Sequence, residues 1–191
     1  MLGRIKFNIS FFLIKLVSLD YWAIKRVIKR WSRRNETVLD LGCGNGYLAP
    51  AFSSKGYLGV DSDPLCIEIA KKTYPKHKFI TANATKVDLE KKFDLVLIVG
   101  LIHHLDNKET RNTINVIKRH LKKGGRVLVI EAIPPMDKWN VLGRLIRSVD
   151  HGEHVRPLKS YLNILDKQFS VKYAKQVRGG IVDYGVFVLK N

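Results

Sequence analysis

The sequence predicts an α/β fold built on a mainly parallel sheet with helices on both faces. Between residues 37 and 132, short apolar runs alternate with segments of helical pattern, which is the order expected for strands joined by crossover helices. The runs are apolar almost throughout, as is typical of strands buried on both sides. The chain then ends in two strand-like runs joined by Arg-Gly-Gly, which predicts a hairpin. These three observations predict a doubly wound sheet.

Proline and glycine mark the ends of two predicted helices. Pro64 is suited to the first turn of a helix, and Gly124 and Gly125 are predicted to close the helix before them. The predicted strands cover residues 37–41, 57–61, 77–82, 93–100, 126–132, 169–177 and 181–190. The predicted helices cover residues 46–55, 64–74, 108–121, 138–148 and 157–167.

The composition bounds the class of protein. A chain of 191 residues with 46% hydrophobic residues can form one ordinary domain with a sizeable core. It contains two cysteines, Cys43 and Cys66. Two cysteines cannot build a disulfide scaffold or a four-cysteine metal site, and so few suit a reducing compartment. The sequence therefore predicts a cytoplasmic protein without a bound metal.

The chain is strongly basic, with a formal net charge of +17. Residues 1–36 hold nine Lys/Arg and two acidic residues, and residues 137–178 hold nine and four, so the excess gathers toward the two ends. Such a field favours anionic partners, namely nucleic acid, anionic lipid or an acidic small molecule. A general enrichment in lysine that serves no partner is the alternative.

Residues 1–34 show apolar residues at the spacing of one helical face, with basic residues toward the end. We therefore divide the chain into a basic amphipathic segment (residues 1–35) and a domain (residues 36–191). Three roles fit the segment: a helix packed on its own domain, often as a lid over the site; an interfacial helix on an anionic membrane; or an arm that binds nucleic acid. Polar residues interrupt the apolar run, which is too short to span a membrane, and no secretory cleavage site follows it.

Asp40 stands near the end of the first predicted strand, and glycines follow at positions 42, 44 and 46. One glycine would serve a tight turn, whereas three at alternate positions let a ligand approach the backbone closely. The dinucleotide fingerprint G-x-G-x-x-G would need a glycine where Tyr47 stands, and no Gly-Lys-Ser/Thr of a phosphate loop follows. Asp40 would repel a pyrophosphate and attract an ammonium group.

Polar residues at the ends of the next two strands complete the predicted ligand. The second strand ends at Asp61, where a carboxylate typically accepts hydrogen bonds from both ribose hydroxyls, while Asp63 is the better cap for the following helix. Asn83 and Ala84 follow the third strand, where an amide can bind the edge of an adenine. An amine, a ribose and an adenine without a phosphate describe S-adenosylmethionine.

Four segments together resemble the class I S-adenosylmethionine-dependent methyltransferases: VLDLGCGNG, GVDSDP, FDLVLIVGLIHHL and LKKGGRVLVIEA. The resemblance covers about residues 36–132. It implies a seven-stranded sheet of order 3-2-1-4-5-7-6 with strand 7 antiparallel, and a substrate-covering insertion over residues 137–168. The cofactor contacts that it implies are Asp40, Gly42, Gly44 and Gly46 around the methionine part, Asp61 at the ribose, Ser62 against the adenine, and Asn83 and Ala84 at its edge, with Cys43 and Gly100 also at the cofactor.

Methyl transfer from a sulfonium is a direct displacement, in which the enzyme aligns the reactants and excludes water. A general base helps where the acceptor is a hydroxyl, and histidine suits that role near neutral pH. We select His154 and His151 from the segment before the last hairpin, and His104 from the histidine pair after the fourth strand. Glu131 ranks below them, and a structural role near the cofactor is expected within the histidine pair.

Arg156 is predicted to clamp an anionic substrate, with Tyr161 also at the substrate. The motif style and the apolar, basic N-terminal segment favour a small-molecule or lipid-like acceptor, which can be anionic. RNA is the alternative that the net charge favours, but VGLIHH stands where enzymes that methylate amino groups of nucleic acids usually carry Asn/Asp-Pro-Pro-aromatic. A non-catalytic S-adenosylmethionine-binding partner subunit is a further alternative. The sequence indicates no oligomeric state.

Overall fold

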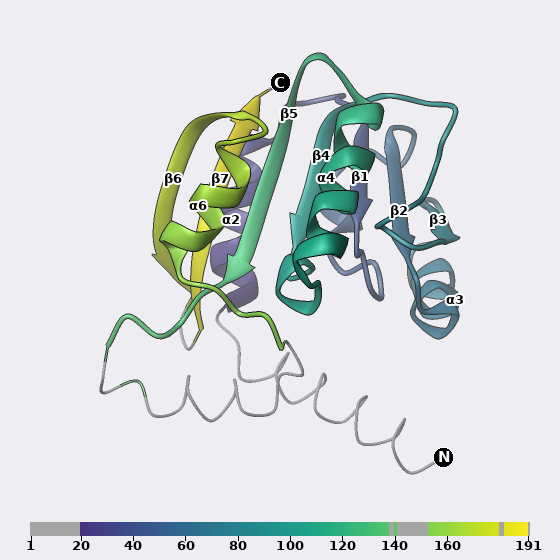
Figure 1. The fold of residues 1–191 in the computed structure, drawn as a ribbon. Helices are drawn as coiled ribbons and strands as arrows, with labels where there is room; N and C mark the ends of the chain where they lie inside the picture. Colours follow the sequence, from purple (N-terminus) through teal and green to yellow (C-terminus); the bar gives the residue numbers. More distant parts are fainter. Residues whose placement is uncertain (1–19, 138–139, 141–152, 180–181, 191) are drawn as a thin grey trace.

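The structure is a computed structural model and describes residues 20–137, 140, 153–179 and 182–190 (Figure 1). Its centre is a seven-stranded sheet of order β3-β2-β1-β4-β5-β7-β6. Neighbouring strands run parallel except β7, which is antiparallel to both β5 and β6. This arrangement confirms the predicted fold class, the strand order and the final hairpin.

The elements follow the predicted order along the chain. The strands are β1 (Val38–Leu41), β2 (Tyr57–Asp61), β3 (Lys78–Thr81), β4 (Phe93–Val99), β5 (Leu121–Ala132), β6 (Ser170–Arg178) and β7 (Asp183–Lys190). The helices are α2 (Asp20–Trp31), α3 (Pro64–Thr73), α4 (Asn107–His120) and α6 (Leu158–Leu165). Short 3₁₀ turns cover Ala49–Ala51 and Ile102–His104. The helix predicted over residues 138–148 lies outside the described residues.

Two local predictions about helices are wrong. The helix expected over residues 46–55 is a single 3₁₀ turn, because Gly46 adopts a positive φ of 71° and Phe52 is already extended. The helix predicted over residues 108–121 is α4, within one residue at each end, but Gly124 and Gly125 do not close it, because β5 already begins at Leu121. Gly124 takes a φ of 75° near the start of β5, where the pairing register with β4 shifts.

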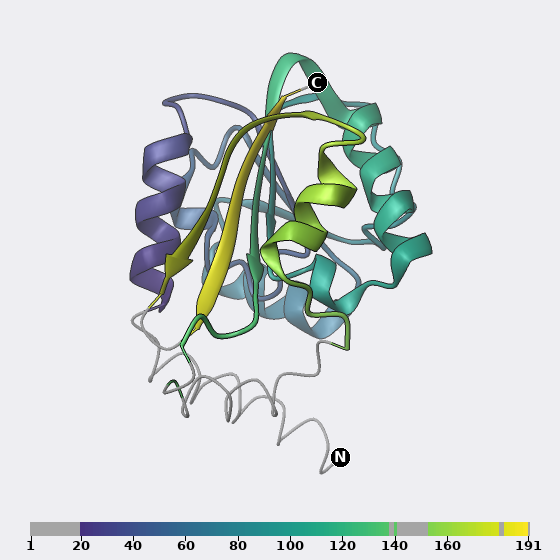
Figure 2. The same ribbon diagram turned by 60° about the vertical axis from the view of Figure 1, so that its left-hand side comes forward.

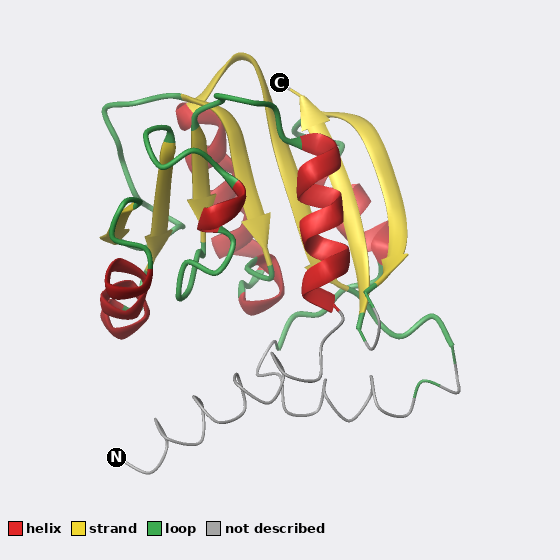
Figure 3. Ribbon diagram, turned by 180° about the vertical axis from the view of Figure 1, so that it is seen from behind, coloured by secondary structure: helices red, strands yellow, loops and turns green. Residues whose placement is uncertain are grey.

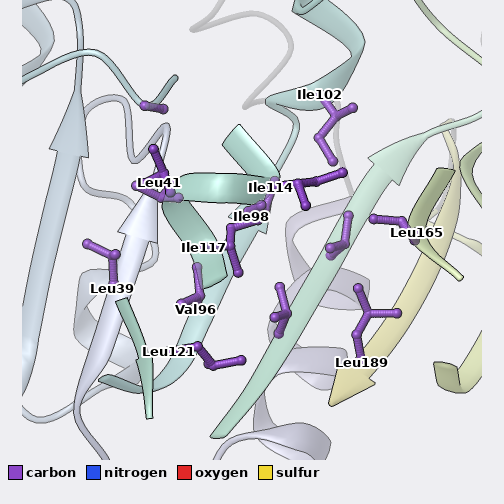
Figure 4. Packing of buried hydrophobic residues seen from close by; sticks show 14 of the residues in the cluster. Leu39, Leu41, Val96, Ile98, Ile102, Ile114, Ile117, Leu121, Leu165 and Leu189 are labelled. Atoms are coloured by element: carbon purple, nitrogen blue, oxygen red, sulfur yellow. The ribbon is translucent and has the colours of Figure 1, made fainter. Parts of the chain in front are cut away.

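Both faces of the sheet are covered by helices (Figures 2 and 3). On one face, Ile114 and Ile117 of α4 and Leu165 of α6 join strand residues in one apolar cluster (Figure 4). On the other face, Ile24 of α2 and Ile67 of α3 belong to a second cluster. Burial of apolar area on both sides stabilises the sheet and fixes where its strand ends lie.

α2 is held on the sheet by both apolar and ionic contacts. Ile28 is fully buried. Arg126 of β5 donates to the carbonyl oxygen of Trp31 and pairs with Glu36, and both charged side chains are buried. Residues 20–31 thus pack on their own domain, which is one of the three predicted roles; residues 1–19 lie outside the described residues. No helix in the described part of the chain is long and apolar enough to cross a membrane.

Candidate functional site

A cavity of about 590 Å³ opens at the carboxyl ends of β1, β2 and β4. The strand order reverses here, since β2 lies on one side of β1 and β4 on the other, and open α/β sheets bind ligands at such points. α2 contributes Tyr21 and Ile24 to the wall. The predicted cofactor-binding residues that line the cavity are Asp40, Gly42, Cys43, Gly44, Asp61, Ser62, Asn83, Ala84 and Gly100.

The glycine loop after β1 depends on backbone conformations that other residues rarely adopt. Gly42, Gly44 and Gly46 have φ values of 77°, 51° and 71°. A Cβ on Gly46 would lie 2.7 Å from the ring of Phe79, whereas a Cβ on Gly44 would meet nothing within 4 Å. Gly46 therefore sits behind the loop against the core, and Gly44 borders open space where a ligand can approach the backbone.

Alanine at Gly46 is expected to lower the free energy of unfolding by about 2–5 kcal/mol. A positive φ costs a residue with a Cβ about 1–2 kcal/mol, and the overlap with Phe79 adds about 1–3 kcal/mol. Alanine at Gly44 is the matched control, because it has only the cost of the positive φ and no overlap with a neighbour. Urea unfolding followed by circular dichroism measures both losses. Equal losses at the two positions would contradict the role given to Phe79.

Asp61 is oriented by the backbone at the mouth of the glycine loop. One carboxylate oxygen accepts a hydrogen bond from the backbone N–H of Gly44 at 2.8 Å, and the other accepts from the N–H of Asp63 at 3.0 Å. Asp63 itself caps α3 by accepting from the N–H of Leu65, as predicted. The Asp61 carboxylate thus faces the cavity in a fixed orientation, which suits an acceptor for two neighbouring hydroxyls.

The adenine end of the predicted site lies after β2 and β3. Ser62 and Asn83 are exposed at the cavity, and Ala84 is buried beside them. The side-chain oxygen of Asn83 accepts from the N–H of Thr85 at 2.8 Å, which leaves the amide N–H₂ as the group that can donate to a ligand.

Asp40 is a buried carboxyl group at the base of the cavity. Its exposed fraction is 2%, and the Tyr57 hydroxyl donates a hydrogen bond to it at 2.6 Å. The pKa of Asp40 is raised to about 7, mainly by burial; the Tyr57 hydrogen bond opposes this shift and the negative charge of Asp61 adds to it. A ligand ammonium group at this point would favour the ionised form.

Cofactor affinity is expected to fall as the pH drops below about 7, because only ionised Asp40 attracts an ammonium group strongly. One linked proton limits the fall to about tenfold per pH unit. In the cofactor-free protein, stability should also fall as the pH rises from 3.8 toward about 7, since the folded state keeps a proton that the unfolded state has released.

Isothermal titration with S-adenosylhomocysteine below, at and above pH 7 measures this dependence. The Asp40→Asn variant is the control, since it should bind weakly at every pH. A wild-type affinity that does not change with pH would contradict the role of Asp40.

Asn45 supplies an acceptor that the sequence analysis missed. Its side-chain oxygen is buried and has no hydrogen-bond partner among the described residues, and Asn45 lines the cavity. A buried acceptor without a donor is costly, so a ligand N–H or O–H group would satisfy it. Asp40, Asn45, the open space at Gly44 and the anchored Asp61 together fit the amine and ribose of S-adenosylmethionine.

The two thiols at the cavity are unsuited to nucleophilic chemistry. Cys43 and Cys66 are both free and both line the cavity. Burial raises the pKa of Cys43 strongly and that of Cys66 to about 12, so both stay protonated at neutral pH. Within the described ranges, no group of His, Cys, Asp and Glu is placed to hold a metal ion.

A buried glutamate organises the loop after β4. Glu131 of β5 is fully buried, and one of its oxygens accepts from the backbone N–H groups of Leu101 at 2.9 Å and Ile102 at 2.7 Å. Its other oxygen lies 2.8 Å from Nδ1 of His103. His103 is also buried and lines the cavity, and exposed His104 lies beside it with ring centroids 4.1 Å apart. The contact between Glu131 and His103 therefore connects the cavity wall to the end of β5.

The structure places the other predicted site residues around this loop. Among the described residues, His104 lines the cavity, but His154, Arg156 and Tyr161 do not. The His154 backbone N–H donates to the carbonyl oxygen of His103 at 2.9 Å. Tyr161 is buried in the core on α6, and burial raises its pKa to about 12. His151 lies outside the described residues.

The Arg156 guanidinium donates hydrogen bonds to backbone carbonyl oxygens. It donates to the carbonyl oxygens of Ile102 at 3.1 Å, Leu105 at 3.0 Å and His154 at 3.0 Å. Arg156 thus joins the segment before α6 to the loop of residues 100–106 between β4 and α4, called the histidine loop below. The substrate and catalytic roles assigned to Arg156, Tyr161, His154, His151 and His104 stay predictions.

The chain has the fold of the class I S-adenosylmethionine-dependent methyltransferases, and its cavity fits S-adenosylmethionine, the cofactor of that class. Residues 38–125 match the family model of methyltransferase domains. The match covers β1 to the start of β5 and includes the glycine loop, Asp61 and the histidine loop.

Curated relatives agree with this assignment. The ubiquinone biosynthesis O-methyltransferase of Rickettsia conorii is 25% identical over 154 residues, which cover 72% of this chain and 52% of the relative. The demethylmenaquinone methyltransferase of Thermotoga maritima is 29% identical over 120 residues, which cover 60% of this chain and 52% of the relative. The chain therefore spans about half the length of these relatives.

Solved structures share the fold. A TehB-like SAM-dependent methyltransferase from Corynebacterium glutamicum superposes with a TM-score of 0.66 at 21% identity, covering 87% of this chain and 86% of that one. Human N-acetylserotonin methyltransferase in complex with SAM also gives a TM-score of 0.66, at 20% identity, and covers 87% and 51% of the two chains.

Proposed function

We propose that this protein transfers a methyl group from S-adenosylmethionine to a hydroxyl group of a small-molecule or lipid-like acceptor. The names of its relatives support an acceptor of this size, since they include a ubiquinone biosynthesis O-methyltransferase and a demethylmenaquinone methyltransferase. The single observation that carries the proposal is the buried contact between Glu131 and His103 at the wall of the cofactor cavity.

His103 is the group that we propose accepts the hydroxyl proton. The carboxylate of Glu131 accepts hydrogen bonds, so the neutral imidazole carries its proton on Nδ1 and its basic nitrogen is Nε2. When bound, S-adenosylmethionine supplies the methyl group, whose bond to sulfur breaks as its bond to the acceptor oxygen forms. His103 takes the proton that the acceptor oxygen loses, and Glu131 stabilises the imidazolium that results. His104, exposed at the same cavity, is the second candidate base.

The described cavity wall favours an uncharged apolar acceptor. Its apolar members include Val99, Leu101, Leu105 and Tyr184, and none of its described members is a lysine or an arginine. The described wall carries four carboxyl groups and no cation that could offset them, which disfavours an anionic acceptor; they are Asp40, Asp61, Asp63 and Glu109. A phenol or catechol ring with a neutral side chain therefore suits the site better than an anionic substrate.

A label-transfer assay tests the proposal. Full-length protein is incubated with methyl-labelled S-adenosylmethionine and, separately, with phenols, catechols and total RNA. We expect transfer to a phenol or catechol, and His103→Gln should lower kcat by about 10²–10⁴-fold while S-adenosylhomocysteine affinity stays within a few fold. The matched variant His104→Gln should keep most of the activity.

Other outcomes would reassign the function. If His104→Gln loses activity and His103→Gln does not, the general base is His104 and not His103. Label found only in RNA would favour the RNA methyltransferase alternative. Tight S-adenosylhomocysteine binding without transfer to any acceptor would favour a non-catalytic partner subunit.

A further inference from the structure

We propose that the outward side of α2 docks this protein on the surface of an anionic phospholipid bilayer. The docking surface, called the basic face below, consists of Trp22, Arg26, Lys29 and Arg30 of α2 with Lys175 of β6. The inference stands apart from the proposed acceptor, because it concerns a surface that lies outside the cofactor cavity.

The basic face follows from the way α2 is placed. The apolar side of the helix is turned to the sheet, where Ile24 and Ile28 are buried. The opposite side carries Trp22, Arg26 and Lys29, which recur at intervals of three and four residues and are all exposed. Because the apolar side is occupied, α2 itself cannot insert that side into a bilayer. It can only lie against a surface through its basic side.

A groove of about 780 Å³ runs between α2 and β6, which lie side by side (Figure 2). It is distinct from the cofactor cavity, because Tyr21 and Ile24 line the cavity and Trp22 and Ala23 line the groove. β6 is the edge strand of the sheet and contributes Lys175 to the groove. The basic face thus continues from the helix onto the sheet edge.

The charges of the basic face are uncompensated within the described part of the chain. No carboxylate there pairs with Arg26, Lys29, Arg30 or Lys175. Arg178, at the end of the groove, differs, since it pairs with Asp137 at 2.6 Å and Asp183 at 3.2 Å. Such a positive surface attracts the anionic headgroups of a bilayer.

The exposure of Trp22 favours a lipid surface as the partner of the basic face. Its exposed fraction is 71%, the largest among the exposed large hydrophobic residues of the described chain. Tryptophan is enriched at membrane interfaces, where the indole sits at the level of the headgroups. An exposed indole flanked by arginine and lysine is therefore suited to a bilayer surface.

The remaining aromatic rings argue against single-stranded nucleic acid as the occupant. Binding of bases requires open ring faces on which they can stack. Trp31 and Tyr173 instead contact each other with centroids 5.0 Å apart, and the Arg30 guanidinium lies over both rings at 5.6 and 5.9 Å. Among the described residues that line the groove, this leaves Trp22 as the one aromatic ring that is widely exposed, which is too few for a stacked strand.

Vesicle sedimentation of the full-length protein tests the docking surface. Vesicles of phosphatidylcholine alone are compared with vesicles that also contain phosphatidylglycerol, at low and at high salt. We expect binding to the anionic vesicles only, and we expect high salt to weaken it. The double variant Arg26→Gln with Lys29→Gln should lower the partition coefficient by about 30-fold, the effect of two basic residues at an anionic surface.

A charge-matched control separates the basic face from the net charge. Lys71→Gln with Lys76→Gln removes two exposed charges at the opposite edge of the sheet, beside β3, and should leave sedimentation unchanged. Trp22→Ala should weaken binding in a way that persists at high salt. S-adenosylhomocysteine titration verifies folding, since neither Arg26 nor Lys29 lines the cofactor cavity.

Three results would overturn the proposal: equal binding to both kinds of vesicle, equal losses in the two double variants, or binding of a single-stranded oligonucleotide that competes with the vesicles and is lost in Arg26→Gln with Lys29→Gln. The last result would assign the basic face to nucleic acid. Each readout is independent of methyl transfer, so failure here leaves the proposed function standing.

Discussion

Replacing Asp61 by alanine is expected to weaken S-adenosylhomocysteine binding by about 10²-fold or more. In the proposed complex this carboxylate accepts from both ribose hydroxyls, and a hydrogen bond to a charged group contributes about 1.5–3 kcal/mol. The loss also removes the acceptor for the N–H groups of Gly44 and Asp63, so the glycine loop loses the contact that orients it. Isothermal titration measures the affinity directly.

Asp63→Ala is the matched control for this variant. It removes a carboxylate two residues away that caps α3, at a cost of about 1 kcal/mol of stability, but it leaves the proposed ribose acceptor in place. Its affinity should therefore change only a few fold. If the two variants bind equally well, Asp61 does not hold the ribose.

Replacing Glu131 by glutamine is expected to lower both activity and stability. A glutamine has one acceptor oxygen and an N–H₂ donor, so it cannot accept from Leu101, Ile102 and His103 Nδ1 as the carboxylate does. Buried donors left unpaired cost about 1–3 kcal/mol each, which predicts a loss of about 2–4 kcal/mol in the free energy of unfolding. Without the carboxylate, the tautomer and orientation of His103 are no longer fixed, and kcat should fall by about 10²–10³-fold.

A double-mutant cycle distinguishes positioning from general destabilisation. If Glu131 acts through His103, then Glu131→Gln combined with His103→Gln should be little slower than His103→Gln alone. Glu109→Gln, which alters another carboxylate at the cavity, should cost far less activity. Urea unfolding gives the stability of each variant. Additive losses of activity in the double variant would show that Glu131 acts independently of His103.

The sequence could predict the parts of the site that are set by local chain direction. Asp40 and Asp61 lie at the carboxyl ends of parallel strands, and Gly42, Gly44 and Asn83 follow strands, so the topology alone brings them to one edge. Their convergence on one cavity required only the correct strand order, which the alternating pattern and the resemblance supplied.

The sequence could not predict contacts decided by side-chain direction between distant segments. Glu131 and His103 are 28 residues apart, and nothing in either segment specifies that their side chains meet. The hydrogen bonds from Arg156 to the carbonyl oxygens of Ile102 and Leu105 likewise join segments about fifty residues apart, and neither segment specifies them. The helix after Gly46 was overpredicted because a positive φ is invisible in composition.

α2 borders both the cofactor cavity and the basic face, so binding at one of them can be linked thermodynamically to binding at the other. Tyr21 and Ile24 face the cofactor cavity, while Trp22 and Arg26 face outward. If engagement of the outward side shifts the helix, it changes cofactor affinity, and reciprocity then requires the cofactor to change the affinity for the surface by the same factor. The ratio of cofactor affinities with and without vesicles would measure how rigidly the helix is joined to the sheet. If α2 does not move when its outward side is engaged, the cofactor affinities measured with and without vesicles would be equal.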